Sequence, residues 1–183
     1  MKYLEDKDCW ITTFTGKKIH LITPLEEEID ILDIAHALAM TCRFAGHCTA
    51  YYSVAEHSIR VMNEVSHIYR LQALLHDAAE AYILDVPRPF KEWFPFYKVC
   101  ETNLTNVIFK KYNVHADIES DKIVKLADNR ILATEGRDIM LNTEGWGLDC
   151  VPCKDKITPM SYIIAESNFL FMFNLLKKLD IFI

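Results

Sequence analysis

Four side chains with metal-binding chemistry interrupt apolar stretches of this sequence. His57, His76, Asp77 and Asp128 each stand among apolar residues in a segment with helical periodicity. Burying an unpaired charge is costly, so each of these groups needs a partner. A divalent cation bound by all four would satisfy them together, and two imidazoles with two carboxylates suit Mn, Co, Ni, Fe or Zn. Such an ion lowers the pKa of its bound water and supplies a nucleophile at neutral pH.

Each of these residues also has a simpler explanation when taken singly. An inward histidine such as His57 is more often a hydrogen-bonded core residue, and a His-Asp pair is common by chance. Asp128 alone would pair with Lys125 or Arg130 at the surface. The four residues in this order are more specific than any one of them, which favours the metal site.

The rest of the chain must supply elements that bring these groups together. Alternating residues over about 10–22, with a turn at Thr15-Gly16-Lys17, predict a small N-terminal β-hairpin. Helical stripes of apolar residues predict helices over about 31–42, 54–65, 68–82, 96–112, 121–140 and 159–179. The fold class we expect is all-α, a helical bundle with that hairpin, in one domain over 1–183 whose motif-bearing core spans about 30–140.

Local signals predict where several of these elements begin and end. Ser53 and Glu56 form an S-x-x-E capping box, Ser120 is a candidate cap, and Pro159 suits the first position of the last helix. The prolines in Asp85–Pro89 predict a loop. Glu56 is explained by capping alone, and we expect His36 to be a core histidine.

Composition excludes several classes of function. The 183 residues are 51% hydrophobic and 25% charged, which is ordinary for a soluble protein. Lys and Arg total 20 against 26 Asp and Glu, a net charge of −6 that argues against a nucleic-acid polymer as partner. No apolar stretch is long enough to span a membrane, and the first residues are too charged for a signal peptide. The scattered cysteines indicate a reduced, cytoplasmic protein, with no zinc at Cys150 and Cys153.

Four segments together resemble a known enzyme family. The segments Tyr52–Ser58, Leu74–Glu80, Asp85–Pro89 and Lys125–Asp128 resemble the HD-domain phosphohydrolases. The similarity is greatest to the 5′-deoxynucleotidase branch and to short phage-type relatives that degrade deoxyadenosine nucleotides. It covers about residues 10–140 and implies an all-α bundle. It also implies that the metal ligands are His57, His76, Asp77 and Asp128.

The resemblance implies roles for two further carboxylates. Glu80 shares a helix face with His76 and Asp77 and would do general acid and base work; otherwise it is a surface glutamate. Asp85 would be a second active-site carboxylate; otherwise it is a turn residue before Pro87.

Four further residues would bind substrate if the resemblance holds. Arg43 and Lys91 would hold phosphate, with a solvated lysine as the alternative for Lys91. Phe44 would pack against the sugar and exclude a 2′-hydroxyl, where better-known bacterial members have Trp. His47 would touch phosphate or ribose, or neither. Trp146 is expected in the core or a subunit interface.

The expected function is hydrolysis of deoxynucleotides, with dATP (and dADP or dAMP) giving deoxyadenosine and phosphate or polyphosphate. Water would attack the α-phosphorus, and Mg could accompany the substrate phosphates. The alternatives are a general 5′-deoxynucleotidase acting on dNMPs, a nucleotide phosphodiesterase, and a non-catalytic nucleotide-binding module. We expect a homo-oligomer, because members of the family commonly self-associate and two C-terminal segments, Phe169–Phe173 and Ile181–Ile183, are strongly apolar. If the protein is phage-encoded, it would work in the host cytoplasm.

Overall fold

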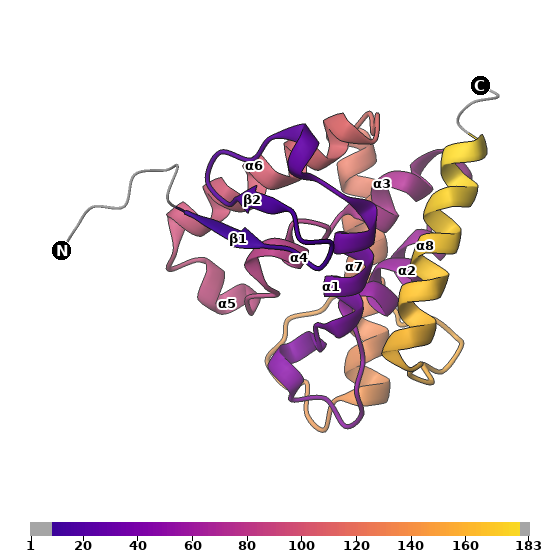
Figure 1. Cartoon of the computed structure of the whole chain (residues 1–183). Helices are drawn as coiled ribbons and strands as arrows, with labels where there is room; N and C mark the ends of the chain where they lie inside the picture. The colour runs from indigo at the N-terminus through magenta and orange to yellow at the C-terminus, as the bar shows by residue number, and fades with distance from the viewer. Residues whose placement is uncertain (1–8, 180–183) are drawn as a thin grey trace.

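The computed structural model describes residues 9–179, which begin with a short hairpin (Figure 1). Strand β1 (Trp10–Thr12) pairs antiparallel with β2 (Lys18–His20), and Ile11 lies opposite Ile19. The turn closes through a hydrogen bond from Thr13 N to Lys17 O at 2.9 Å. Gly16 has φ +82°, a conformation that glycine adopts without strain. The predicted hairpin is confirmed.

The remaining elements are helical, which confirms the predicted all-α fold. They follow in chain order as η2 (Glu26–Glu28), α1 (Ile31–Met40), η3 (Arg43–Gly46), α2 (Val54–Asn63), η4 (His67–Tyr69), α3 (Arg70–Leu75), α4 (Glu80–Ile83), α5 (Arg88–Lys91), α6 (Pro95–Lys111), α7 (Ile118–Ile139) and α8 (Tyr162–Leu179). None of the helices within residues 9–179 has the length and apolar character that crossing a membrane requires.

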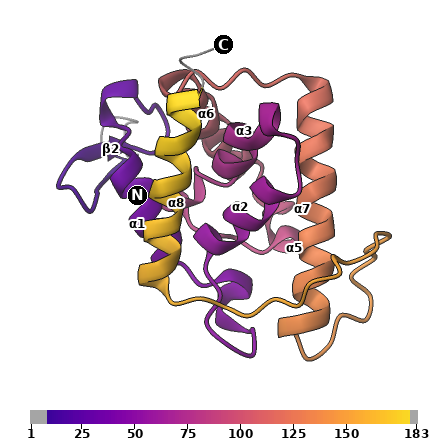
Figure 2. The same cartoon turned by 90° about the vertical axis from the view of Figure 1, so that its right-hand side faces the viewer.

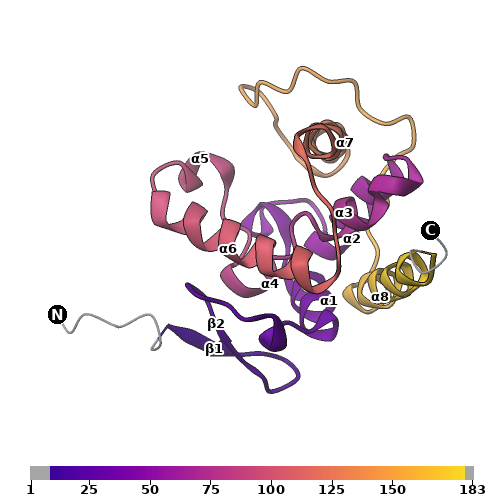
Figure 3. The same cartoon turned by 90° about the horizontal axis from the view of Figure 1, so that it is seen from above.

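Helix α2 lies in the middle of the bundle. Figure 2 shows α8 on one side of α2 and α3, and α7 on the other, and Figure 3 looks along α7 with α8 across the molecule. Helix α2 packs against α1, α3, α7 and α8. Its side chains Val61 and Met62 are fully buried, as are Leu74 of α3 and Phe169 of α8. The polar side chains Glu56, His57 and Ser58 of α2 are therefore removed from water.

The C-terminal apolar segment is mostly core. Phe169 and Phe173 are buried, and Phe173 packs edge-on against Tyr112 at 4.8 Å between ring centroids. Phe171, in contrast, is exposed. Only part of Phe169–Phe173 is thus free to meet another subunit, and Ile181–Ile183 lies outside the described residues.

The predicted helix over 68–82 is interrupted at the residues that matter most. Helix α3 ends at Leu75 and α4 begins at Glu80. Between them the hydrogen bonds span three residues, from Ala78 N to Leu75 O and from Glu80 N to Asp77 O, both at 3.0 Å. This tighter winding turns the chain more per residue than an α-helix does. It replaces the regular helix where His76 and Asp77 stand side by side.

Several predicted boundaries are wrong by a few residues. Helix α1 stops at Met40, and Asp117 rather than Ser120 caps α7; Ser120 instead completes the capping box from the third position. Helix α8 begins at Tyr162, so Pro159 lies before it. The loop at 85–89 is shorter than predicted, because α5 starts at Arg88. Two residues a few positions apart can each cap the same helix, and the packing of the folded protein decides which of them does so.

The cap of α2 was predicted correctly at one of its two residues. Ser53 Oγ accepts a hydrogen bond from Glu56 N at 3.1 Å. The Glu56 carboxylate does not return to the cap; it accepts from Arg60 Nη2 at 2.6 Å and from Met160 N at 2.8 Å. Glu56 therefore ties α2 to the segment before α8, and the capping explanation for this residue was wrong.

Candidate metal centre

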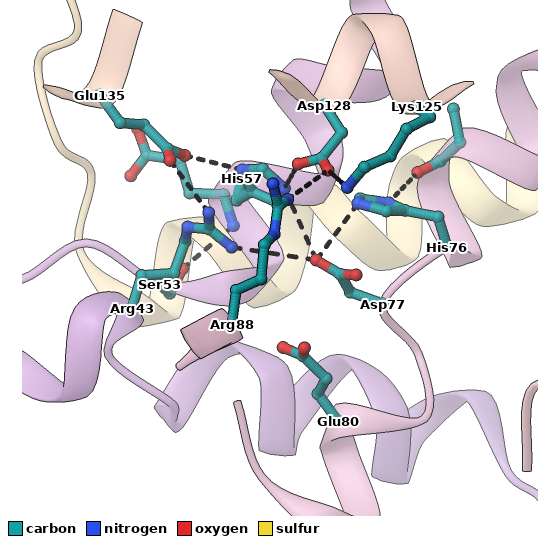
Figure 4. A network of polar contacts seen from close by, with 12 residues as sticks. Arg43, Ser53, His57, His76, Asp77, Glu80, Arg88, Lys125, Asp128 and Glu135 are labelled. Carbon is teal, nitrogen blue, oxygen red and sulfur yellow. Dashed lines mark hydrogen bonds and ion pairs between the residues drawn. The ribbon is translucent and has the colours of Figure 1, made fainter. Parts of the chain in front are cut away.

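Three segments bring His57, His76, Asp77 and Asp128 to one point (Figure 4). His57 is in α2, His76 and Asp77 are in the tight turn after α3, and Asp128 is in α7. His57 Nε2 lies 3.2 Å from Asp128 Oδ1 and 3.5 Å from Asp77 Oδ2. His76 Nε2 lies 3.2 Å from the same Asp77 oxygen. The four predicted ligands are therefore neighbours, although up to 71 positions separate them in the chain.

Both imidazoles are held through Nδ1. His57 Nδ1 hydrogen-bonds Glu135 Oε1 at 2.7 Å, and His76 Nδ1 hydrogen-bonds the carbonyl oxygen of Ala73 at 2.8 Å. A carbonyl or an ionised carboxylate can only accept, so each Nδ1 carries the proton. In the neutral rings Nε2 then has a free lone pair, which is how protein histidines are presented to metals.

The two Nε2 atoms are the group's strongest indication of a metal site. Among the described residues, neither buried Nε2 has a hydrogen-bond partner of ordinary geometry. His57, His76 and Asp128 each offer a ligand atom, and these three atoms lie within 4.8 Å of one another. Asp77 Oδ2 adjoins both rings. Buried nitrogens without partners and a nearby carboxylate fit a divalent cation, so the group of His57, His76 and Asp128 could hold a metal ion.

The electrostatics of the cluster favour positive charge at its centre. Burial raises the pKa of Asp77 and of Asp128, but the histidines outweigh it, so both carboxyl groups stay below their ordinary pKa. Burial and Arg43 lower the pKa of His57, yet Glu135 and Asp128 outweigh them and raise it to about 9. The protein thus attracts a proton to the position that a cation would take.

Glu135 is the functional candidate that sequence reasoning missed. Its side chain is fully buried on α7, and its second oxygen accepts a hydrogen bond from Arg43 Nη2 at 3.0 Å. The carboxyl pKa is lowered because Arg43 and His57 outweigh the effect of burial. A signal was present: Glu135 follows Asp128 by seven residues, two turns on the same face as Ile131.

Arg43, a candidate for binding phosphate, contacts the group of metal-ligand candidates directly. The residue is buried, and its guanidinium lies 3.9 Å from Asp77 Oδ2 through Nη1. Its Nε is buried and has no hydrogen-bond partner within residues 9–179. Arg43 thus lies against both Asp77 and Glu135.

Glu80 lies in a different electrostatic setting from the ligands. Burial raises its pKa well above the ordinary value, and Asp77 and Asp85 raise it further. Lys91 Nζ contacts Glu80 Oε1 at 3.0 Å and Glu101 Oε1 at 2.7 Å, so the alternative of a solvated lysine is wrong. The pKa of Asp85 is also raised by burial. Glu80 is thus suited to hold a proton beside carboxylates that are ionised.

A cavity of about 980 Å³ opens over this cluster. Its walls include every predicted site residue except the fully buried His57. Arg88 and Lys125, which sequence reasoning did not select for a role here, also line it, and Lys125 Nζ lies 2.6 Å from Asp128 Oδ2. His47 is at the exposed rim.

Two other residues differ from their predicted setting. Trp146 is half-buried in the cavity wall, 5.6 Å from the ring of Phe44, so it does not lie in the core. His36 is only half-buried; it stacks on Phe14 at 3.8 Å and contacts Glu166 at 3.2 Å through Nδ1. It belongs to a surface contact rather than to the core.

Comparison with known proteins gives relatives but no activity. No family model matches the sequence. YfdR of Escherichia coli K12, an uncharacterized protein, is 36% identical over 174 residues, which cover 93% of this chain and 97% of that protein. The uncharacterized protein RCAP_rcc00048 of Rhodobacter capsulatus is 31% identical over 145 residues, 73% of this chain and 74% of that one. Identity at this level over nearly the whole length assigns the chain to the same protein family as YfdR.

Proposed function

We propose that this protein is a metal-dependent phosphohydrolase of deoxynucleotides, of the HD-domain kind that its motifs resemble. The observation that carries the proposal is that the Nε2 atoms of His57 and His76 converge with the carboxylates of Asp77 and Asp128. This group lies beneath a cavity whose lining includes basic side chains. The donor set suits Mn, Co, Ni, Fe or Zn. A bound divalent cation would lower the pKa of a water molecule and neutralise phosphate charge.

The cavity has the size and charge for a nucleotide. Its volume of about 980 Å³ is at the upper end of ordinary small-molecule pockets. Four basic residues line it, together with five acidic ones that a bound divalent cation would help to balance: Arg43, Arg88, Lys91 and Lys125 with Asp77, Glu80, Asp85, Glu101 and Asp128. Local cations of this kind bind phosphate oxygens even where the whole protein is acidic.

Glu80 and Asp85 supply the proton transfers. The oxygen of a water molecule bonds to the α-phosphorus, and the bond from phosphorus to O5′ breaks. Glu80, protonated through its raised pKa, gives its proton to the departing O5′. Asp85, with a carboxyl pKa that burial also raises, accepts the proton of the water. Arg43 donates to the phosphate oxygens as negative charge grows there.

The favoured substrate is dATP, with dADP and dAMP as further substrates. The products are deoxyadenosine and phosphate or polyphosphate, and Mg accompanies the polyphosphate. A general 5′-deoxynucleotidase would use the same groups on dNMPs. A binding module has no need for a buried glutamate with a raised pKa next to the cluster, which favours catalysis.

We also propose that the protein works in the cytoplasm and self-associates. None of the six cysteines, which all lie within residues 9–179, forms a disulfide bond. Apolar side chains stand exposed along α8, including Ile163, Ile164 and Phe171.

The decisive experiment is a substrate and metal panel. Purified protein freed of metal by chelation is given each of Mn, Co, Ni, Zn, Fe and Mg with deoxy- and ribonucleotides as mono-, di- and triphosphates. We expect deoxyadenosine nucleotides to be hydrolysed fastest, and ³¹P NMR identifies phosphate against triphosphate as the product.

Matched variants make the result specific. Asp77→Asn should lose metal binding and activity, whereas Asp155→Asn, an exposed residue outside the cavity, should keep both. Equal rates for all four bases would remove the dATP preference. No hydrolysis of any nucleotide with any of the six metals would refute the proposed function.

A further inference from the structure

Trp146 lies in the cavity wall, on the loop that follows α7. This loop and η3 lie toward the same end of the molecule (Figures 1 and 2). The segment after η3 is tied to the C-terminal end of α7 by a hydrogen bond from Thr49 N to Ile139 O at 2.9 Å. The indole is half-buried and tilted by 33° against the ring of Phe44. Two aromatic side chains from segments a hundred residues apart thus share one part of the cavity.

Three glycines shape the backbone that carries Trp146. Gly145 and Gly147, on either side of it, have φ +80° and +63°, which side chains other than glycine's adopt only with strain. Gly136 of α7 lies under the same loop: a Cβ there would come 2.9 Å from Thr143 Cγ2 and 3.6 Å from Trp146 Cζ3. The loop is therefore built to hold the indole against α7.

The partner ring is held in an equally unusual backbone. Phe44 has φ +57° and Ala45 φ +51°, and both line the cavity. A non-glycine residue in this region costs free energy, and such residues gather at ligand sites. The Arg43 guanidinium lies 5.2 Å from the Phe44 ring and also contacts Asp77. The aromatic pair is thus next to the phosphate-binding side of the cluster.

We propose that Trp146 is the residue that binds the nucleobase, by stacking on it while Phe44 packs against the sugar. This inference rests on the proposed function, which places a phosphate at Arg43 and the metal ligands. A flat base prefers an aromatic face, and stacking tolerates any base but gains most from the larger purine surface. The half-buried indole leaves part of its surface for that contact.

The test compares two substrates that differ only in the base. The protein is assayed with dAMP and with 2-deoxyribose 5-phosphate, as wild type, Trp146→Leu and Trp146→Phe. For dAMP, Trp146→Leu should raise KM about 5- to 100-fold with kcat nearly unchanged, and Trp146→Phe should restore most of the loss. For the base-free sugar phosphate neither variant should change KM. Gly136→Ala would place a Cβ 2.9 Å from Thr143 Cγ2 and so push on the loop that carries Trp146. It should change KM in the same direction as Trp146→Leu and replaces that variant if the latter does not fold.

The control is Trp93→Leu, because Trp93 is 81% exposed and outside the cavity wall. This variant should leave KM and kcat unchanged for both substrates. If Trp146→Leu changes KM equally for both substrates, or changes KM for neither, the stacking role is overturned. If the wild type hydrolyses nothing, the proposed function fails, and calorimetry with deoxyadenosine decides the inference separately: binding that Trp146→Leu removes supports it, and unchanged or absent binding overturns it.

Discussion

The Glu135 carboxylate accepts a hydrogen bond of 2.7 Å from His57 Nδ1, with both side chains fully removed from water. The same carboxylate holds Arg43. One buried group therefore sets the tautomer of a metal-ligand candidate and the position of a phosphate-binding candidate. Partners of this kind orient a ligating imidazole and raise its basicity.

Removing the charge of Glu135 should weaken metal binding. Glu135→Gln keeps the size of the side chain but gives His57 Nδ1 a neutral partner. We expect the affinity for Co²⁺ or Mn²⁺ to fall about 10- to 100-fold, measured by equilibrium titration of the metal-free protein. Glu119→Gln, the same change at an exposed position of α7, serves as the control and should leave the affinity unchanged. Equal affinities of wild type and Glu135→Gln would contradict the role of this contact.

Glu80 should matter for turnover and not for metal binding. Burial, Asp77 and Asp85 raise the pKa of its carboxyl group, which lies outside the group of ligand atoms. Glu80→Gln should therefore lower kcat by about 10²- to 10⁴-fold while the metal content stays at the wild-type level. Glu92→Gln, nearby and exposed, is the matched control. A variant with wild-type kcat would show that Glu80 transfers no proton.

The metal-free protein should lose stability as pH rises. The pKa of His57 is raised to about 9 in the fold, against about 6.5 in the unfolded chain. The folded state then binds the extra proton, so this stabilisation is complete below about pH 6.5 and disappears as pH passes about 9. We expect a loss on the order of 2–3 kcal/mol in the free energy of unfolding.

Urea unfolding in the presence of a chelator, at about pH 6 and about pH 9.5, measures this change. His57→Gln should have a flatter profile, because it has no imidazole to protonate. A wild-type protein as stable at the higher pH as at the lower would refute the prediction.

The cap of α2 supports the helix that carries His57. Ser53→Ala removes the hydroxyl oxygen that accepts from Glu56 N and should cost about 1 kcal/mol of unfolding free energy. Ser66→Ala is a suitable comparison, because Ser66 precedes η4 without a side-chain cap bond. Thermal unfolding of both variants would test the difference; equal losses would mean that the Ser53 hydroxyl is not a cap of ordinary strength.

Short-range signals predicted most of the fold. The turn glycine Gly16, the cap Ser53 and the apolar stripes of the long helices act between residues a few positions apart, so their effect can be read from neighbours. Where two such signals compete, as at Asp117 and Ser120, only packing decides between them. The break at His76 and Asp77 was missed for the same reason, since the local pattern there is that of one continuous helix.

The sequence by itself determined the types and order of the four ligand candidates and the helices that carry His57 and Asp128, because periodicity and local chemistry specify these. Only the tertiary structure decided that Glu135 lies under His57, that Lys91 is held between Glu80 and Glu101, and that Trp146 faces Phe44. The Glu135 and Trp146 contacts join residues 78 and 102 positions apart. No interaction between neighbours in the chain specifies such pairs; they arise when the helices pack, and buried polar groups must then find partners.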